Sequence, residues 1–211
     1  MLNKQPLSVF LDELASDSPA PGGGSVAALA GSLGTALAAM VCRLTIGKKK
    51  YLDVAEDMKH ALQQLEDHRK TFTALIESDT NAFNKVMEAF TLPKESEDQR
   101  VVRTAAIQEA TKEAALVPLE VMKHVIDTLA IVKLVAEKGN INSISDAGVS
   151  ALMLTAACEG ASLNVQINLN SITDSEFVGW REEEIKSLTR TGRLQADDIL
   201  STVRRKISTK K

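Results

Sequence analysis

Three groups of polar residues have types and spacings that could support chemistry, and the first follows a run of glycines. Pro21-Gly22-Gly23-Gly24-Ser25 precedes a long stretch of small apolar residues. Consecutive glycines lower the stability of an ordered segment, so they indicate that the backbone closely approaches another group. A helix that begins here would direct N–H groups and a partial positive charge at an anion or a polarised oxygen. A flexible turn with Ser25 as the helix cap explains the segment equally well.

The second group centres on Asp79, a carboxylate within an otherwise apolar heptad pattern. A buried carboxylate is unfavourable unless it is paired or hydrogen-bonded. Burial also raises its pKa, which suits a general acid or base. These residues alone slightly favour the alternative, a structural ion pair with Arg43, Arg69 or a lysine.

The third group is the pair Asn164 and Asn168, which are one helical turn apart. They fall on the opposite side of the expected helix from Glu159, Ser162 and Gln166, which we expect to face solvent. Two inward amides suit the recognition of a planar, hydrogen-bonding heterocycle. Hydrogen bonding between helices is an equally good explanation.

The elements that must position these groups are all expected to be helices. Residues 55–90 alternate apolar positions by three and four, which commits them to one long helix, and only Arg69 and Asp79 interrupt this heptad seam. Pro118 lies inside another helical stretch and is expected to bend or divide it. Ser145 or Asp146 is expected to cap the helix that follows. The expected helices cover Leu7 to Leu14, the glycines to about Gly47, and residues 55–90, 97–137, 145–169 and 176–207.

We therefore predict an all-α fold for residues 1–211. It is a single domain, a bundle of long antiparallel helices with one helix kinked or divided near Pro118. The aromatic content of 3% agrees with closely packed helices, because sheets favour aromatic side chains. Gly31 and Gly34 belong to columns of small residues, for which close helix packing is a sufficient explanation.

Composition excludes several classes of function. A net charge of −3 gives no basic surface for nucleic acid. Cys42 and Cys158 have no paired spacing, so we expect neither a disulfide framework nor a metal site, and we expect a reducing, cytoplasmic location. The three histidines, at positions 60, 68 and 124, show no metal-ligand pattern and are expected at the surface.

Two apolar segments bear on export and membrane insertion. Val26 to Cys42 carries no charge, but it is shorter than the roughly 20 strongly apolar residues of a membrane span. We therefore expect a buried helix and no membrane. Asp12 and Glu13 interrupt the first apolar stretch, which argues against a signal peptide.

The three groups occur in a fixed order with further motifs. These are Leu44-Thr45-Ile46-Gly47-Lys48-Lys49-Lys50-Tyr51, Val117-Pro118-Leu119, Gly139-Asn140 and Ser145-Asp146-Ala147-Gly148-Val149. The ordered set, from Leu7 to Leu169, resembles the formiminotetrahydrofolate cyclodeaminase and methenyltetrahydrofolate cyclohydrolase family. The resemblance implies antiparallel helices, usually in a homodimer. It also implies a reduced folate as substrate, with no metal and no cofactor beyond that tetrahydrofolate.

The resemblance also assigns residues. Gly22, Gly23, Gly24 and Ser25 match the glycine-rich loop of the folate site, and Asp79 matches the acidic position of an Asp-x-x-Ala-Phe motif, the best candidate for proton transfer. Lys48, Lys49 and Lys50 match a basic turn, and our hypothesis is that they bind the glutamate or polyglutamate tail. Asn140, Asp146, Asn164 and Asn168 match motif positions to which we assign no individual role.

Two reactions and one non-enzymatic function fit this resemblance. The cyclodeaminase reaction, which we place first by a small margin, forms methenyltetrahydrofolate and ammonia, and the cyclohydrolase reaction forms formyltetrahydrofolate. Vertebrate relatives carry a formiminotransferase domain before this one, so we expect any such transferase to be a separate protein here. The alternative is a helical interaction protein whose heptad seam binds a partner, with Arg69 and Asp79 specifying the register.

Overall fold

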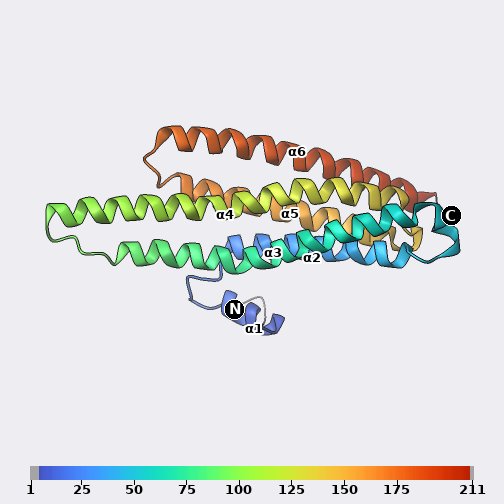
Figure 1. Cartoon of the computed structure of the whole chain (residues 1–211), viewed down its shortest axis with the longest axis horizontal. Coiled ribbons are helices and arrows are strands. Elements are labelled where there is room, and N and C mark those ends of the chain that lie inside the picture. The colour runs from blue at the N-terminus through green and yellow to red at the C-terminus, as the bar shows by residue number, and fades with distance from the viewer. Residues whose placement is uncertain (1–4, 210–211) are drawn as a thin grey trace.

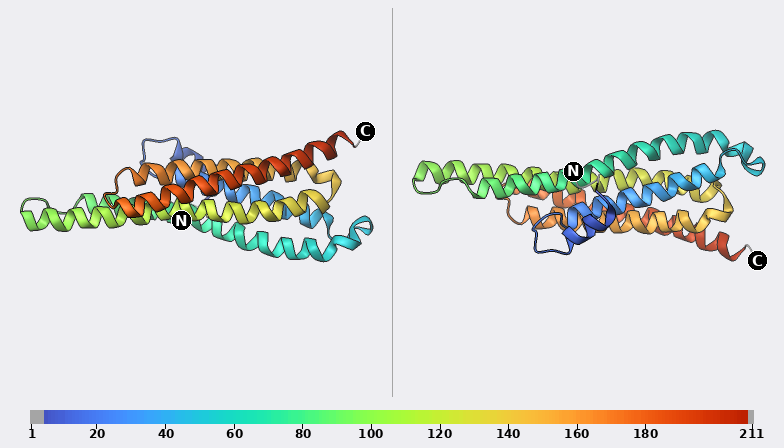
Figure 2. Two further views of the ribbon diagram at one scale, coloured as in Figure 1. Left: turned by 90° about the horizontal axis from the view of Figure 1, so that it is seen from above. Right: turned by 90° about the horizontal axis from the view of Figure 1, so that it is seen from below.

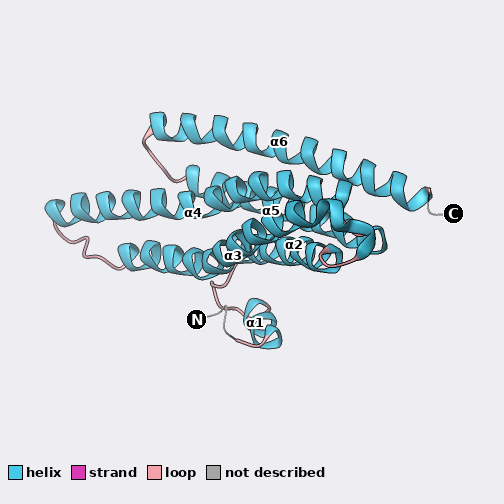
Figure 3. Ribbon diagram, turned by 45° about the vertical axis from the view of Figure 1, so that its right-hand side comes forward, coloured by secondary structure: helices cyan, strands magenta, loops and turns pink. Residues whose placement is uncertain are grey.

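A computed structural model of the chain describes residues 5–209, and its regular structure over that range is helical throughout (Figures 1 and 3). This confirms the predicted all-α fold. The heptad pattern forms one helix, as expected. The helices are α1 (Leu7–Leu14), α2 (Gly23–Thr45), α3 (Ala55–Phe90), α4 (Glu97–Lys138), α5 (Ile144–Leu169) and α6 (Ser175–Ser208), with short 3-10 turns η2 (Lys49–Val54) and η3 (Ile141–Ser143).

Helices α2 to α5 form an antiparallel four-helix bundle, in which α2 packs against α3 and α5 while α4 packs against α3, α5 and α6 (Figure 2). Helix α6 also packs against α5, and α1 contributes the buried ring of Phe10 to the core. Helices α3 and α4 continue well past the beginning of α2 (Figure 1). The bundle therefore has one end where α2 begins and another where α2 ends.

Small residues on α2 allow its neighbours to approach closely. A Cβ atom on Gly31 would lie 2.6 Å from the ring of Phe72 on α3. A Cβ atom on Gly34 would lie 2.9 Å from the carbonyl oxygen of Ser150 on α5, whose hydroxyl donates to the Gly34 carbonyl over 2.7 Å. The packing interpretation of these two glycines is confirmed.

Two predicted helix features differ in the structure. Helix α4 runs through Pro118, which is buried within it, so of the two predicted outcomes, a bend or a division, the division does not occur. The lost N–H group costs one hydrogen bond, and the buried neighbours Leu119 and Val121 hold the helix together. Helix α5 begins at Ile144 with Ser143 as its N-cap, so the cap predicted at Ser145 or Asp146 is wrong.

Three side chains expected at the surface are at least partly buried. His68 on α3 and His124 on α4 face each other, with their Nδ1 atoms 3.1 Å apart. Ser162 is buried and donates to the carbonyl oxygen of Glu159. Sequence periodicity missed these positions because long α3–α4 contacts and the covering helix α6 bury faces that would otherwise be exposed.

Two segments, Gly23–Thr45 and Ile141–Leu169, are long and apolar enough to cross a membrane. In this bundle 56% and 50% of their most apolar windows are buried inside the protein. Core helices of soluble proteins have the same length and composition, so these segments are weak evidence for a membrane and agree with the predicted buried helix.

Candidate functional site

A cavity of about 350 Å³ opens at the end of the bundle where α2 begins, within the size range of small-molecule sites. Its wall combines the loop before α2 with α3, α4 and α5. The lining residues are Pro19, Ala20, Gly22, Gly23, Gly24, Asp79, Phe83, Val86, Ala114, Asn164, Ile167 and Asn168. The fold thus brings the three groups of polar residues from the sequence into one place.

Asp79 lies against the first turn of α2. A Cβ atom on Gly24 would lie 2.6 Å from Cγ of Asp79 and overlap its Oδ1, so glycine is required at this position. The fully buried hydroxyl of Ser25 lies 2.9 Å from Oδ2 of Asp79, to which it donates, and 3.3 Å from Oγ1 of Thr80. The carboxylate of Asp79 therefore occupies the helix N-terminus, where the sequence predicted an anion or a polarised oxygen.

The three glycines are not equivalent. A Cβ atom on Gly23 would lie 3.2 Å from Nδ2 of Asn164, whereas one on Gly22 would lie 4.0 Å from its nearest neighbour, the Pro19 carbonyl oxygen. The close approach predicted from the glycines is confirmed at Gly24 and, less tightly, at Gly23. Gly22 has room for a side chain.

Asp79 makes no ion pair within the described part of the chain. Arg43 and Arg69 both bind Glu66, at 2.8 and 2.6 Å, so the alternative that paired either of them with Asp79 is wrong. Burial raises the pKa of Asp79 above the ordinary value of an aspartate, and hydrogen bonds from the hydroxyl and N–H of Ser25 oppose that rise. The result is a carboxyl group suited to exchange a proton with a bound molecule.

Asn164 and Asn168 reach the cavity from α5. The amide nitrogen of Asn164 donates to the carbonyl oxygen of Gly160 over 2.8 Å. That of Asn168 donates to the carbonyl oxygens of Asn164, over 3.0 Å, and of Ala114 on α4, over 3.2 Å. The bond from Asn168 to Ala114 joins α5 to α4, which confirms the hydrogen bonding between helices. The side-chain oxygens of the two residues can still accept hydrogen bonds, so the recognition of a heterocycle stays a prediction.

Several lining residues were missed as site residues. Phe83 and Val86 belong to the heptad seam and read as core positions, although the end of the seam lies beyond α2 and borders the cavity. Ala114 contributes its backbone carbonyl, which no sequence pattern reveals. Thr80 is not part of the cavity wall, but its hydroxyl lies 3.3 Å from that of Ser25. Its place next to Asp79 in the sequence was the one available signal of such a polar neighbour.

Comparison with known proteins shows the family to which this chain belongs. The family model described as Formiminotransferase-cyclodeaminase matches residues 6–187, which include every residue of the cavity wall. The chain belongs to this family. The resemblance found in the sequence is confirmed.

Relatives in the family act on folates. The methenyltetrahydrofolate cyclohydrolase of Methylorubrum extorquens is 42% identical over 208 residues, which cover 99% of this chain and 100% of that protein. The formimidoyltransferase-cyclodeaminase of Gallus gallus is 39% identical over 82% of this chain, which corresponds to 32% of its own length. The crystal structure of formiminotetrahydrofolate cyclodeaminase from Thermotoga maritima superposes with a TM-score of 0.81, at 31% identity over 99% of this chain and 98% of that one. The chain is thus an enzyme of the folate cyclodeaminase and cyclohydrolase family.

The fold separates the remaining predicted site residues from the cavity. Lys48, Lys49 and Lys50 follow the C-terminal end of α2, so the length of that helix, about 33 Å, lies between them and the glycine loop. Asp146 lies in the first turn of α5, at the same far end. Within one chain these residues cannot share a ligand's reacting centre with Asp79.

Asn140 has a structural role at this far end. It is buried, and its backbone N–H donates to Oγ1 of Thr45 over 2.8 Å. Its side chain donates to the carbonyl oxygen of Leu44 over 2.9 Å and accepts from the N–H of Asn142 over 3.1 Å. Asn140 therefore joins the end of α2 to the turn before α5, away from the cavity beside α2, and its role in substrate binding stays a prediction.

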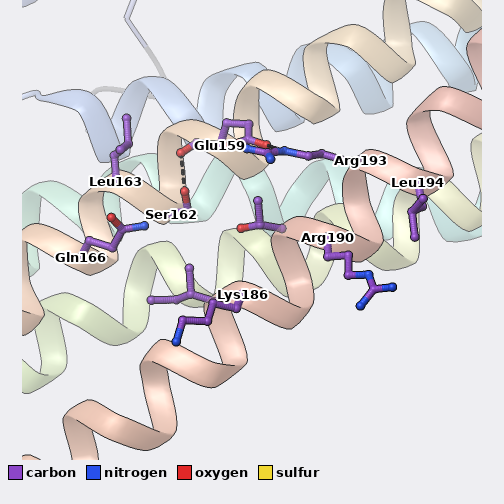
Figure 4. Close-up of a pocket in the computed structure, with 10 residues that line it drawn as sticks. Glu159, Ser162, Leu163, Gln166, Lys186, Arg190, Arg193 and Leu194 are labelled. Carbon is purple, nitrogen blue, oxygen red and sulfur yellow. Dashed lines mark hydrogen bonds and ion pairs between the residues drawn. The ribbon is translucent and has the colours of Figure 1, made fainter.

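A larger groove, of about 590 Å³, lies between α5 and α6 (Figure 4). Figure 4 shows Glu159 and Arg193 directed at each other across it, and these side chains form an ion pair. Glu159, the one carboxylate that lines this groove, is therefore already paired. The cations Lys186 and Arg190 extend from α6 away from Ser162. The groove lacks the buried acid and oriented amides of the cavity beside α2.

Proposed function

We propose that the chain acts on the one-carbon unit of a reduced folate bound in the cavity beside α2, with Asp79 as its proton-transfer group. The observation that carries this proposal is the position of Asp79. It is partly buried, lacks a cationic partner among the described residues and is held by Ser25 beside two oriented amides. A protein with a purely structural role would not need this combination.

The residues of the cavity have complementary roles in this reaction. Both family reactions pass through a tetrahedral carbon that carries two folate nitrogens and one further heteroatom. Asp79 takes a proton from the attacking group and returns one to the leaving group, a role that a raised pKa favours. The oxygens of Asn164 and Asn168 accept hydrogen bonds from N–H groups of the heterocycle, and Phe83 supplies an apolar surface for a ring. Together they restrain the folate for ring closure or opening.

We place the cyclohydrolase reaction first of the two. The cyclohydrolase of Methylorubrum extorquens matches this chain over its full length at 42% identity. The cyclodeaminase reaction, which sequence reasoning placed first, remains the second candidate. It is supported by the cyclodeaminase of Thermotoga maritima, which also matches over nearly its whole length, at 31% identity.

The setting of this activity is also a proposal. We infer a cytoplasmic homodimer that accepts polyglutamylated folates and binds neither nucleic acid nor membranes. The net charge of −3 and the buried, free thiols of Cys42 and Cys158 support this setting. The reaction as proposed uses no resident metal and no cofactor beyond the folate itself.

An absorbance assay that follows methenyltetrahydrofolate tests the function. Enzyme-dependent loss of the compound in water supports the cyclohydrolase, and its formation from formiminotetrahydrofolate with release of ammonia supports the cyclodeaminase. If neither reaction is accelerated and no reduced folate raises the unfolding temperature, the proposed function is wrong and the helical interaction protein becomes the better explanation.

The variant Asp79→Asn tests the assigned group. The amide keeps the shape of the side chain but cannot take up and release a proton as the carboxyl does. Turnover should therefore fall by about 10²–10⁴-fold while folate binding persists. Asp67→Asn, on the exposed face of the same helix, is the matched control and should keep wild-type turnover. Near-normal turnover in Asp79→Asn would remove Asp79 from the mechanism.

A further inference from the structure

The turn between α5 and α6 is tied to helix α4 by a set of directional contacts. The amide nitrogen of Gln108 on α4 donates to the carbonyl oxygen of Ser171 over 2.9 Å. The amide oxygen of Gln108 accepts from the N–H of Thr173 over 2.8 Å and from its hydroxyl over 3.0 Å. One side chain of α4 thus engages three groups of the turn that joins the two other helices (Figure 1).

Lys112 makes a second connection, one helical turn further along α4. Its ammonium nitrogen lies 2.7 Å from Oδ2 of Asp174, the last residue of the same turn. The other oxygen of Asp174, Oδ1, accepts from the N–H of Phe177 over 3.1 Å and so caps α6. Lys112 also lies over the ring of Phe177, with Nζ 5.3 Å from the ring centre. Gln108 and Lys112 therefore hold the turn at several points, and we call these two residues the α4 latch.

The turn held by the α4 latch directly follows the end of α5 that lines the cavity. The N–H of Ser171 donates to the carbonyl oxygen of Asn168 over 3.0 Å, while the carbonyl oxygen of Ser171 accepts from Gln108. The side chain of Asn168 lines the cavity and donates to the carbonyl oxygen of Ala114 on α4 over 3.2 Å. A chain of hydrogen bonds thus leads from α4 through the turn to Asn168 and back to α4.

Attachment of the turn to the bundle does not depend on the α4 latch. Leu169 and Ile172 anchor the turn with buried apolar side chains. The side chains of Lys112 and Asp174 are 27% and 43% exposed, and ion pairs with this exposure contribute little to the free energy of unfolding. Apolar burial has no preferred direction, whereas a hydrogen bond has a preferred angle as well as a preferred distance. The latch therefore fixes the orientation of the end of α5.

We propose that Gln108 and Lys112 are positioning residues for the folate, because they hold the end of α5 where the side-chain oxygen of Asn168 meets the heterocycle. This inference rests on the proposed function and adds two residues that do not line the cavity. Asp79 and Ser25 lie on α3 and α2, whereas the bonds of the latch go to the turn. The latch should therefore govern how tightly the folate is held and leave proton transfer in the bound complex largely unchanged.

Removal of the latch tests this separation of binding from chemistry. Gln108→Leu with Lys112→Met keeps the approximate size of both side chains and removes their bonds to the turn. KM for the folate that the absorbance assay identifies as substrate should rise about tenfold, as when one hydrogen bond to a ligand is lost, and kcat should change by less than about twofold. Lys85→Met is the matched control, because the ion pair of Lys85 with Glu113 joins α4 to α3 over 2.6 Å, and its KM should equal that of wild type.

A double-mutant cycle with Asn168→Leu shows whether the latch acts through that residue. In the Asn168→Leu background the latch variant should raise KM no further, because the group that the latch positions is already absent. Lys112→Arg keeps the cation and should restore most of the affinity that Lys112→Met loses. An unchanged KM in the latch variant, a loss confined to kcat, or effects that add to those of Asn168→Leu overturn the proposal.

Hydrogen exchange of the free protein separates the latch from the proposed function. Loss of the latch should speed exchange of the backbone N–H groups of residues 170–172 by about tenfold, while the first turns of α2 keep the wild-type rate. Unchanged exchange at 170–172 means that the latch does not hold the end of α5, which overturns the proposal. If exchange responds but the wild-type protein neither binds nor turns over a reduced folate, the proposed function fails and the positioning role with it, while the mechanical link from α4 to Asn168 stands.

Discussion

The position of Asp79 depends on the absence of a side chain at Gly24. In Gly24→Ala the new methyl group would overlap the carboxylate, which must move away from the start of α2. We expect turnover to fall by about 10²–10⁴-fold, as when a general acid or base is lost, with little change in helix content. Gly22→Ala is the control, because its Cβ atom would meet nothing closer than 4.0 Å. Steady-state rates measure the turnover of the two variants, and circular dichroism measures their helix content. Equal turnover would show that the close contact between Gly24 and Asp79 is dispensable.

Ser25 should set the pH at which the enzyme becomes active. Its hydrogen bonds lower the pKa of Asp79 against the larger, opposite effect of burial, so Ser25→Ala should raise that pKa further. Since the deprotonated carboxylate is the base, kcat/KM rises with pH through this pKa. Its acidic limb should therefore move to higher pH in the variant. Ser32→Ala removes a hydroxyl bonded to Thr73 on the same pair of helices and should leave the limb in place. If the acidic limb is unchanged in Ser25→Ala, that limb does not report the ionisation of Asp79.

At the scale of elements, local patterns predicted the helices well and their ends less well. The heptad seam of residues 55–90 specifies α3 because an apolar stripe of that length has one compact solution. Pro118 does not divide α4, because the local cost of a proline is offset by burial along a helix of 42 residues. The start of α5 depends on η3 and on bonds from Asn140 to α2, which are tertiary contacts that the local sequence does not reveal.

The contact between α3 and α4 should make stability sensitive to pH. Burial lowers the pKa of His68, as does the adjacent His124, while Asp127 and Asp67 oppose this effect. The unfolded chain then binds more protons than the folded one as pH falls below about 6.5, so the free energy of unfolding should decrease on acidification. Urea unfolding between pH 7.5 and 5 measures this loss. His68→Asn should reduce it and the exposed His60→Asn should not; an identical loss in all three proteins would exclude this contact as the cause.

At the scale of the whole molecule, the site could be predicted only in part. Residue types identified Asp79 and Asn164 as candidate site residues, since an acid or an amide on an apolar face is unfavourable when it has no hydrogen-bond partner. Sequence order could not show that the lysine turn lies at the opposite end of the bundle, because that depends on the direction of α2. The family motifs therefore lie at two ends of the bundle, and one of these ends holds the cavity with Asp79.

Ligand binding should stabilise the whole fold, because the cavity is built from four separate segments that unfolding would separate. A reduced folate at a hundredfold excess over its Kd should raise the free energy of unfolding by about 2.7 kcal/mol. Asn164→Leu with Asn168→Leu removes the two acceptor oxygens, so this stabilisation should largely disappear. Gln166→Leu, an exposed amide between them on α5, is the control and should keep it. Thermal unfolding with and without folate distinguishes these cases. Full stabilisation of the double variant would mean that the heterocycle is recognised elsewhere, and the cavity beside α2 would then hold only the reacting carbon.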